Sequence, residues 1–203
     1  MGSVTSITTL LLDADGVTQY NRTFLERMNV LLDGRATMPE VSRVEALSLT
    51  GQRDFEADLR EFLDERGIEA TTQDLFEPWL DITPDPEVLA MIAEVRGRGV
   101  DVYLGTNQQP VRGRSMTDRP ELYPDIVRQF HSWQIGFAKP DPRFFTHIID
   151  ELQLDPGSTL FIDDLRPNVA AARSVGLVAE FHDREAGAAG VRAILVRHGL
   201  LDA

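Results

Sequence analysis

The segment Leu10-Leu11-Leu12-Asp13-Ala14-Asp15-Gly16-Val17 decides the fold. Its leucines form a short apolar run that ends abruptly at two carboxylates and a glycine, a pattern typical of a strand buried in a parallel sheet. Ligands of α/β folds bind at the carboxyl edge of such a sheet, where both acids would lie. Burying a carboxylate without a partner is costly, so we expect a cationic group nearby.

The bulk composition favours one α/β core with a modest insertion. The chain has 203 residues, of which 42% are hydrophobic, enough for a proper core. It contains no cysteine, which excludes disulfides and thiolate metal sites. Its net charge of −13, with no basic stripe, predicts that nucleic acid is not a partner.

The start of the sequence predicts neither a secretory signal nor a membrane span. No basic residue precedes Arg22, and the apolar run over residues 7–12 is too short for a signal core. We therefore expect a cytoplasmic protein that acts without a membrane partner. Composition leaves both a monomer and a homodimer open.

Residues 18–83 are expected to form a small helical bundle inserted directly after the first strand. Apolar residues recur there at helical spacing, as in Phe24, Met28 and Leu31, and glycines separate the helices. The predicted domains are therefore a core of residues 1–17 and 84–203 and a helical cap of residues 18–83.

The remainder of the chain alternates between helix and strand, which predicts a doubly wound parallel sheet of Rossmann-like type. We expect further strands at residues 100–106, 132–136, 159–163 and 177–181. The helices between them begin at caps followed by proline, as in Asp85-Pro86 and Asp141-Pro142.

Polar groups follow the predicted strands at four places, which are Asp13 with Asp15, Thr106 with Asn107, Lys139, and Asp163 with Asp164. Because parallel strands end at one edge of the sheet, these groups can meet despite their separation in sequence. Lys139 is also the only lysine among 20 basic residues. Codon bias toward arginine is one explanation, and a position that needs a compact ammonium is the other.

The motifs DADGV, LGTNQ, FAKPDP and FIDDLRPN, in this order, resemble those of the haloacid dehalogenase superfamily of phosphohydrolases. The likeness covers essentially the whole chain, and the helical insertion resembles the cap that one subgroup carries after its first strand. It implies Mg²⁺-dependent hydrolysis of a small phosphate monoester, such as a sugar phosphate, through an aspartyl-phosphate on Asp13.

The resemblance also implies a role for each motif residue. Asp15 would be the general acid and base, Thr106 and the backbone of Asn107 would bind phosphoryl oxygens, and Lys139 would hold the nucleophile ionised. The metal would be held by Asp13, the Asp15 carbonyl and Asp164, with Asp163 acting through water or the second shell. An oxygen-only shell suits Mg²⁺ better than zinc.

Within the family, an acid two residues after the nucleophile, here Asp15, indicates phosphate chemistry rather than dehalogenation. The predicted cap contains no lysine, which excludes the Schiff-base chemistry of phosphonatases. A phosphomutase and a catalytically silent binding module remain as alternatives. The cap would select the leaving group, with Arg22 and Arg53 as predicted substrate-binding residues beside Gln19 and Gln52.

Overall fold

The computed structural model describes residues 6–203, which contain a central sheet of five parallel strands in the order β3-β2-β1-β4-β5. The strands are β1 (Thr9–Leu12), β2 (Asp101–Thr106), β3 (Arg128–His131), β4 (Thr159–Asp163) and β5 (Val178–Phe181). Strand β1 therefore lies at the centre of the sheet. The sheet confirms the fold class predicted from the sequence.

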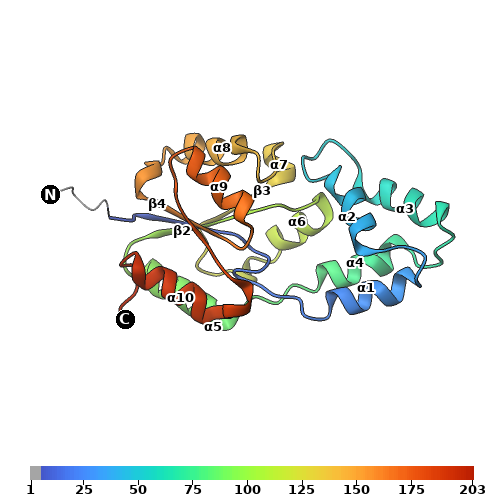
Figure 1. Cartoon of the computed structure of the whole chain (residues 1–203), viewed down its shortest axis with the longest axis horizontal. Helices are drawn as coiled ribbons and strands as arrows, with labels where there is room; N and C mark the ends of the chain where they lie inside the picture. The colour runs from blue at the N-terminus through green and yellow to red at the C-terminus, as the bar shows by residue number, and fades with distance from the viewer. Residues whose placement is uncertain (1–5) are drawn as a thin grey trace.

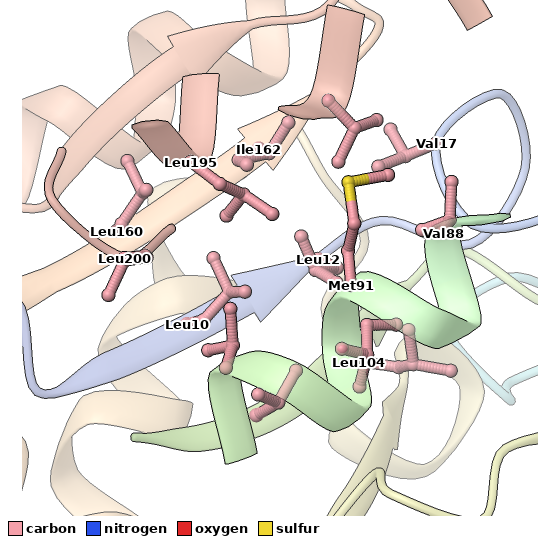
Figure 2. Close-up of a cluster of buried hydrophobic side chains, with 14 of the residues drawn as sticks. Leu10, Leu12, Val17, Val88, Met91, Leu104, Leu160, Ile162, Leu195 and Leu200 are labelled. Carbon is pink, nitrogen blue, oxygen red and sulfur yellow. The ribbon is translucent and has the colours of Figure 1, made fainter. Parts of the chain in front are cut away.

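Helices cover both faces of this sheet (Figure 1). One face carries α5 (Pro86–Gly97) and α10 (Gly187–Arg197), and the other carries α7 (Ser132–Ile135), α8 (Pro142–Leu152) and α9 (Arg166–Ser174). Leu10 and Leu12 point into the first layer and Leu11 into the second. Figure 2 shows Leu10 and Leu12 beside Met91 of α5 and Leu195 of α10. A strand buried on both faces reads as an unbroken apolar run, as this one does.

Four helices, α1 (Phe24–Leu32), α2 (Met38–Ala46), α3 (Phe55–Glu65) and α4 (Thr72–Leu80), form the insertion between β1 and α5. They pack around their own apolar cluster, which includes Met28, Phe55 and Trp79, at the end of the molecule away from the N-terminus (Figure 1). We call these helices the bundle. The predicted helices are thus present, while the exact domain boundaries stay a prediction.

The chain enters and leaves the bundle through two segments that pair with each other. Gln19 forms an antiparallel bridge with Pro84, and the Asp85 amide donates to the Thr18 carbonyl at 2.9 Å. A second attachment lies at the C-terminus of α4, whose final carbonyls lack partners within the helix. Side chains from outside α4 satisfy them: Arg112 Nε donates to the Trp79 carbonyl and Arg119 Nη2 to that of Leu80, at 2.8 and 3.0 Å.

The structure corrects one predicted strand. Residues 132–136 form the short helix α7 and a turn ending at Gly136, whose φ is +85°. The third strand, β3, instead covers the four residues before them and pairs with β2. Helix α6 (Pro110–Thr117) follows β2 and was not predicted. Within residues 6–203, no helix combines the length and hydropathy needed to cross a membrane.

Candidate active site

The register of the three central strands brings the four polar motifs together. Leu12 is paired with Leu104 on one side and with Ile162 on the other. One residue further along, Asp13, Gly105 and Asp163 therefore stand at the same level of the sheet edge. The Asp13 amide donates to the Ile162 carbonyl at 3.0 Å, which extends the ladder to this level.

Lys139 connects all three strand ends. Its Nζ lies 2.9 Å from Asp13 Oδ1, 2.7 Å from Asp163 Oδ2 and 2.8 Å from the Gly105 carbonyl oxygen. The side chain is only 1% exposed. The three contacts match the three donors of an ammonium, so the buried charge is fully compensated.

Asn107 holds Lys139 in place from the neighbouring loop. Its side-chain amide donates to the Lys139 carbonyl at 2.7 Å, and its Oδ1 accepts from the Lys139 amide at 2.8 Å. The lysine is therefore fixed at its backbone as well as at its tip. Asn107, Thr106 and Lys139 all line one cavity with Asp13, Asp15 and Asp164.

Asp13 has one oxygen engaged and one available. Oδ1 accepts from its own neighbour's amide, that of Ala14, at 2.7 Å and from Lys139. Among the described residues, these contacts all involve Oδ1, which leaves Oδ2 for a ligand. Burial raises the pKa of Asp13; Lys139 lowers it and Asp163 raises it, with a net value of about 7. The Asp13 carboxylate thus lacks part of the positive charge that its ionised form requires.

Asp13, Asp163 and Asp164 offer oxygens that all lie within 4.8 Å of one another. Asp163 is already saturated, because it accepts from Lys139, from the Leu165 amide and from the Asn168 side chain. Burial and Asp163 raise the pKa of Asp164, and Arg184 lowers it less. Buried oxygens with an excess of negative charge are a donor set that fits Mg²⁺.

Gly16 lets the loop after β1 lie against the carboxylate of Asp164, which follows β4. Its φ is +88°, in the left-handed region. A Cβ there would lie 2.5 Å from Asp164 Oδ2. Only glycine satisfies both the turn and the proximity of the carboxylate.

Asp15 is held as an ion by groups that the sequence did not reveal. Its carboxylate forms a bidentate pair with Arg112, with Nη2 at 2.7 Å from Oδ1, and also accepts from Gln19 and Gln108 at 2.8 and 3.1 Å. Burial raises the pKa of Asp15, but Arg112 and these amides outweigh it and lower the pKa to about 2. Gln108 also donates to Thr106 Oγ1 at 2.9 Å, so one network joins two motifs.

Two cavities meet at Asp15 and Arg184. The first, of about 210 Å³, contains the acids, Lys139 and Thr106. The second, of about 200 Å³, lies against the bundle. Arg184 lines both cavities; its Nε is 3.4 Å from Asp164 Oδ2 and its side chain is 59% exposed. It begins the short 3₁₀ helix Arg184–Ala186 after β5, and the sequence analysis did not single it out.

The structure does not bring Arg22 or Arg53 into either cavity. Arg53 pairs with Asp58 at 2.5 Å on the bundle surface, and Arg22 is exposed. Gln19 is buried and bonded to Asp15 and to the Tyr123 hydroxyl. Their proposed contact with substrate is thus without support from the geometry.

A family model described as haloacid dehalogenase-like hydrolase matches residues 7–176. Sesquiterpene phosphatase astK of Aspergillus oryzae is 33% identical over 100 residues, 48% of this chain and 50% of that protein. Phosphatase MT3486 of Mycobacterium tuberculosis is 35% identical over 100 residues, 49% and 46% of the two chains. The match thus spans about half the length of these curated relatives.

Solved structures share the fold at lower identity. A HAD-like hydrolase of Porphyromonas gingivalis superposes with a TM-score of 0.75 at 22% identity, over 94% of this chain and 98% of that one. A HAD family enzyme of Bacteroides thetaiotaomicron, crystallised with magnesium and inorganic phosphate, has a TM-score of 0.72 at 20% identity, over 88% and 96%. These neighbours support the architecture of sheet and bundle.

Proposed function

Because this chain belongs to the haloacid dehalogenase-like hydrolase family, we propose that it is a Mg²⁺-dependent phosphatase of small phosphate monoesters. The observation that carries the proposal is the position of Asp13, with Oδ1 fixed by Lys139 and Oδ2 directed to a ligand, in a cavity that also holds Thr106 and Asp164. Relatives named as phosphatases support the same reaction class.

In the proposed first step, Asp13 Oδ2 attacks phosphorus and the bond to the leaving oxygen breaks, giving an aspartyl-phosphate and an alcohol. Thr106 and the Asn107 backbone amide hold phosphoryl oxygens, and Arg184 adds positive charge from the side shared by both cavities. In the second step water attacks the phosphoryl group, releasing phosphate and restoring the Asp13 carboxylate.

Mg²⁺ would be held by Asp13, Asp164 and the Asp15 carbonyl, and when bound it supplies positive charge for the phosphoryl oxygens. Asp163 has a positioning role, since the four hydrogen bonds that it accepts fix Lys139 and the loop that carries Asp164. Lys139 keeps the nucleophile ionised in a site where burial favours its protonated form.

Asp15 is proposed to donate a proton to the leaving oxygen, which departs as the alcohol, and then to accept a proton from the attacking water. The carboxylate that Arg112 holds ionised is ready for the second task. The first requires that substrate loosen the pair with Arg112 enough for Asp15 to take up a proton.

The leaving-group dependence of the rate tests this assignment. Asp13→Asn should abolish turnover of every substrate. Asp15→Asn should lower kcat/KM, which reports the first step, by about 10²–10⁴-fold for an alkyl phosphate and much less for p-nitrophenyl phosphate, because nitrophenolate departs without a proton. It should lower kcat for both substrates, because the attack of water also uses Asp15. EDTA should stop both reactions in wild type.

Product analysis separates the remaining alternatives. Release of inorganic phosphate and a hydroxylamine-sensitive phosphoryl group on acid-quenched wild-type protein support the phosphatase. An isomeric phosphate ester without free phosphate would show a phosphomutase. Metal-dependent phosphate binding with no turnover would identify a silent binding module.

A further inference from the structure

The cavity against the bundle is the place for the leaving group, given the proposed phosphatase function on which this inference rests. It adjoins the phosphate cavity through Asp15 and Arg184. Its remaining lining residues are Asn21, Phe24, Pro78, Trp79 and Arg112. About 200 Å³ is small beside the roughly 300–1,000 Å³ of pockets for drug-sized ligands, so a compact group fits.

The neutral polar group on its wall is already engaged. Asn21 donates both amide hydrogens to carbonyls, those of Pro78 and Asp81 at 2.9 and 3.0 Å. Its Oδ1 accepts from the Thr23 hydroxyl at 3.3 Å. Asn21 is therefore occupied in closing the bundle rather than free to bind a hydroxyl group.

Two of the three charged groups in the lining, Asp15 and Arg112, are engaged as well, and the third, Arg184, lies beside the phosphate cavity with its Nε 3.4 Å from Asp164 Oδ2. Each Asp15 oxygen accepts two hydrogen bonds: Oδ1 from Arg112 and Gln19, and Oδ2 from Arg112 and Gln108. Arg112 donates four hydrogen bonds, three to Asp15 and Gln108 and one to the Trp79 carbonyl. In residues 6–203, none of the buried polar side-chain atoms without a partner belongs to a residue lining this cavity.

The other walls are apolar. Phe24 and Trp79 present two rings with centroids 5.4 Å apart, tilted by 59°, and Pro78 also lines the cavity. Trp79 is fixed from behind by Phe55, edge-on at 5.4 Å. The surface is thus rigid and suited to a hydrocarbon.

We propose that the leaving group of the natural substrate is a compact apolar alcohol, cyclic, aromatic or branched, whose hydrocarbon body packs against Phe24 and Trp79. A sugar would give up hydrogen bonds to water along the wall of Phe24 and Trp79, where only the exposed Arg184 could replace any of them, a loss that a hydrocarbon does not suffer. This departs from the sugar phosphate that sequence resemblance favoured.

Cyclohexylmethyl phosphate and glucose 6-phosphate form a matched pair for the test. Both are phosphates of a primary alcohol on a saturated ring of the same size, and they differ in the hydroxyl groups and the ring oxygen. With Mg²⁺ present, kcat/KM should favour cyclohexylmethyl phosphate by at least about tenfold. Equal or reversed preference overturns the inference.

Variants locate the preference in this cavity. Phe24→Ala should lower kcat/KM for cyclohexylmethyl phosphate by about tenfold and leave that for glucose 6-phosphate within about twofold. Trp79→Phe, which keeps a ring in the bundle core, should weaken the same preference without unfolding the protein. Leu25→Ala is the control, since Leu25 is the next residue of α1, is 60% exposed and does not line the cavity. A selectivity unchanged in both ring variants overturns the inference.

A binding measurement separates this inference from the proposed function. Cyclohexylmethylphosphonate, which is not hydrolysed, should quench tryptophan fluorescence at a lower concentration than glucose 6-phosphate, and Trp79→Phe should remove most of the response. This result with no turnover of any ester would reject the phosphatase and keep the apolar subsite. Turnover of esters with no preference in rate or binding would keep the phosphatase and reject the apolar subsite.

Discussion

Lys139 is the residue on which the candidate site depends most directly. Its ammonium bonds Asp13, Asp163 and the Gly105 carbonyl at 2.7–2.9 Å, one acceptor from the end of each central strand. A guanidinium has a planar fork, a larger volume and no way to point three donors at one such set of acceptors. The lone lysine of the sequence therefore occupies a position where arginine does not fit.

Lys139→Arg should accordingly lower kcat/KM by at least about 10²-fold, although the charge is conserved. The added volume in a buried site should also cost about 1–3 kcal/mol of stability. Steady-state kinetics with p-nitrophenyl phosphate and urea unfolding measure the two effects. Activity within a few-fold of wild type would mean that the lysine reflects composition alone.

Asp164 carries the prediction about metal. Because an ion that binds only the folded state stabilises it, MgCl₂ should raise the Tm of wild type by a few degrees. Asp164→Asn should need at least about tenfold more MgCl₂ for the same rise, because it removes one of the charged ligands. Asp150→Asn, an exposed change on α8, serves as the control. A wild-type Tm that ignores Mg²⁺ would contradict the metal assignment.

At the scale of elements, the loop between α2 and α3 seats the bundle on the core. Gly51 has a φ of +72°, and a Cβ there would overlap the Trp133 carbonyl oxygen of α7. Gly34 has a similar φ of +67° but open space around its Cβ position. Replacing each glycine by alanine therefore separates two free-energy costs. At Gly34 the only cost is that of a left-handed backbone, and at Gly51 the displacement of α7 is added.

Gly34→Ala should cost about 1 kcal/mol from backbone strain alone. Gly51→Ala should cost clearly more, and it should also lower kcat, since the bundle must shift away from α7 and from the candidate site. Urea unfolding and steady-state assays on both variants check this. Equal losses of stability with unchanged kcat would show that the contact at Trp133 does not position the bundle.

Elements with strong apolar patterns could be predicted from the sequence. β1 was recognised because its leucine run stops at Asp13, and α8 because Asp141-Pro142 caps it. β3 was misplaced, since Arg128–His131 offers a single large apolar residue, Phe130, while the apolar residues just after it turn into α7. A short strand at the sheet edge depends on pairing with its neighbour more than on its own sequence pattern.

The same distinction applies to the site. The acids and Lys139 were predicted to meet because each stands at a predicted strand end or just before a helix, and strand ends share an edge. Lys139 in fact follows α7 and precedes α8. Arg112 was not, since its partner Asp15 lies 97 residues away and it sits on a helix with no apolar pattern of its own. Gln108 was passed over within a motif whose Thr106 and Asn107 had chemical roles. Contacts between residues far apart in the chain, including those across the interface of bundle and core, leave no local trace in the sequence.

At the scale of the whole molecule, Glu45 of α2 faces Asp15 and Arg112 across that interface. Burial raises its pKa, Arg112 lowers it less and Asp15 raises it, so the pKa moves from its usual 4.5 to about 7. The folded state thus holds this proton between about pH 4.5 and 7, where the unfolded chain has lost it. Stability falls as pH rises through this range.

Glu45→Gln should remove this loss of stability at higher pH. It should raise the unfolding free energy at pH 8 by about 1–3 kcal/mol, since one pKa unit corresponds to about 1.4 kcal/mol, and have little effect at pH 4. Urea titrations at several pH values test it, with the exposed Glu26→Gln on α1 as the control. A gain of equal size at pH 4 and pH 8 would contradict the assignment.

The paired connection of Gln19 with Pro84 and of Thr18 with Asp85 has a consequence for how such proteins diverge. Since the bundle departs and returns at one point beside the central strand, recombination there can exchange the whole bundle and leave the strand order and the charged edge untouched. New specificities can in this way be acquired in one step, provided that the incoming module ends in carbonyl groups that accept hydrogen bonds from Arg112 and Arg119.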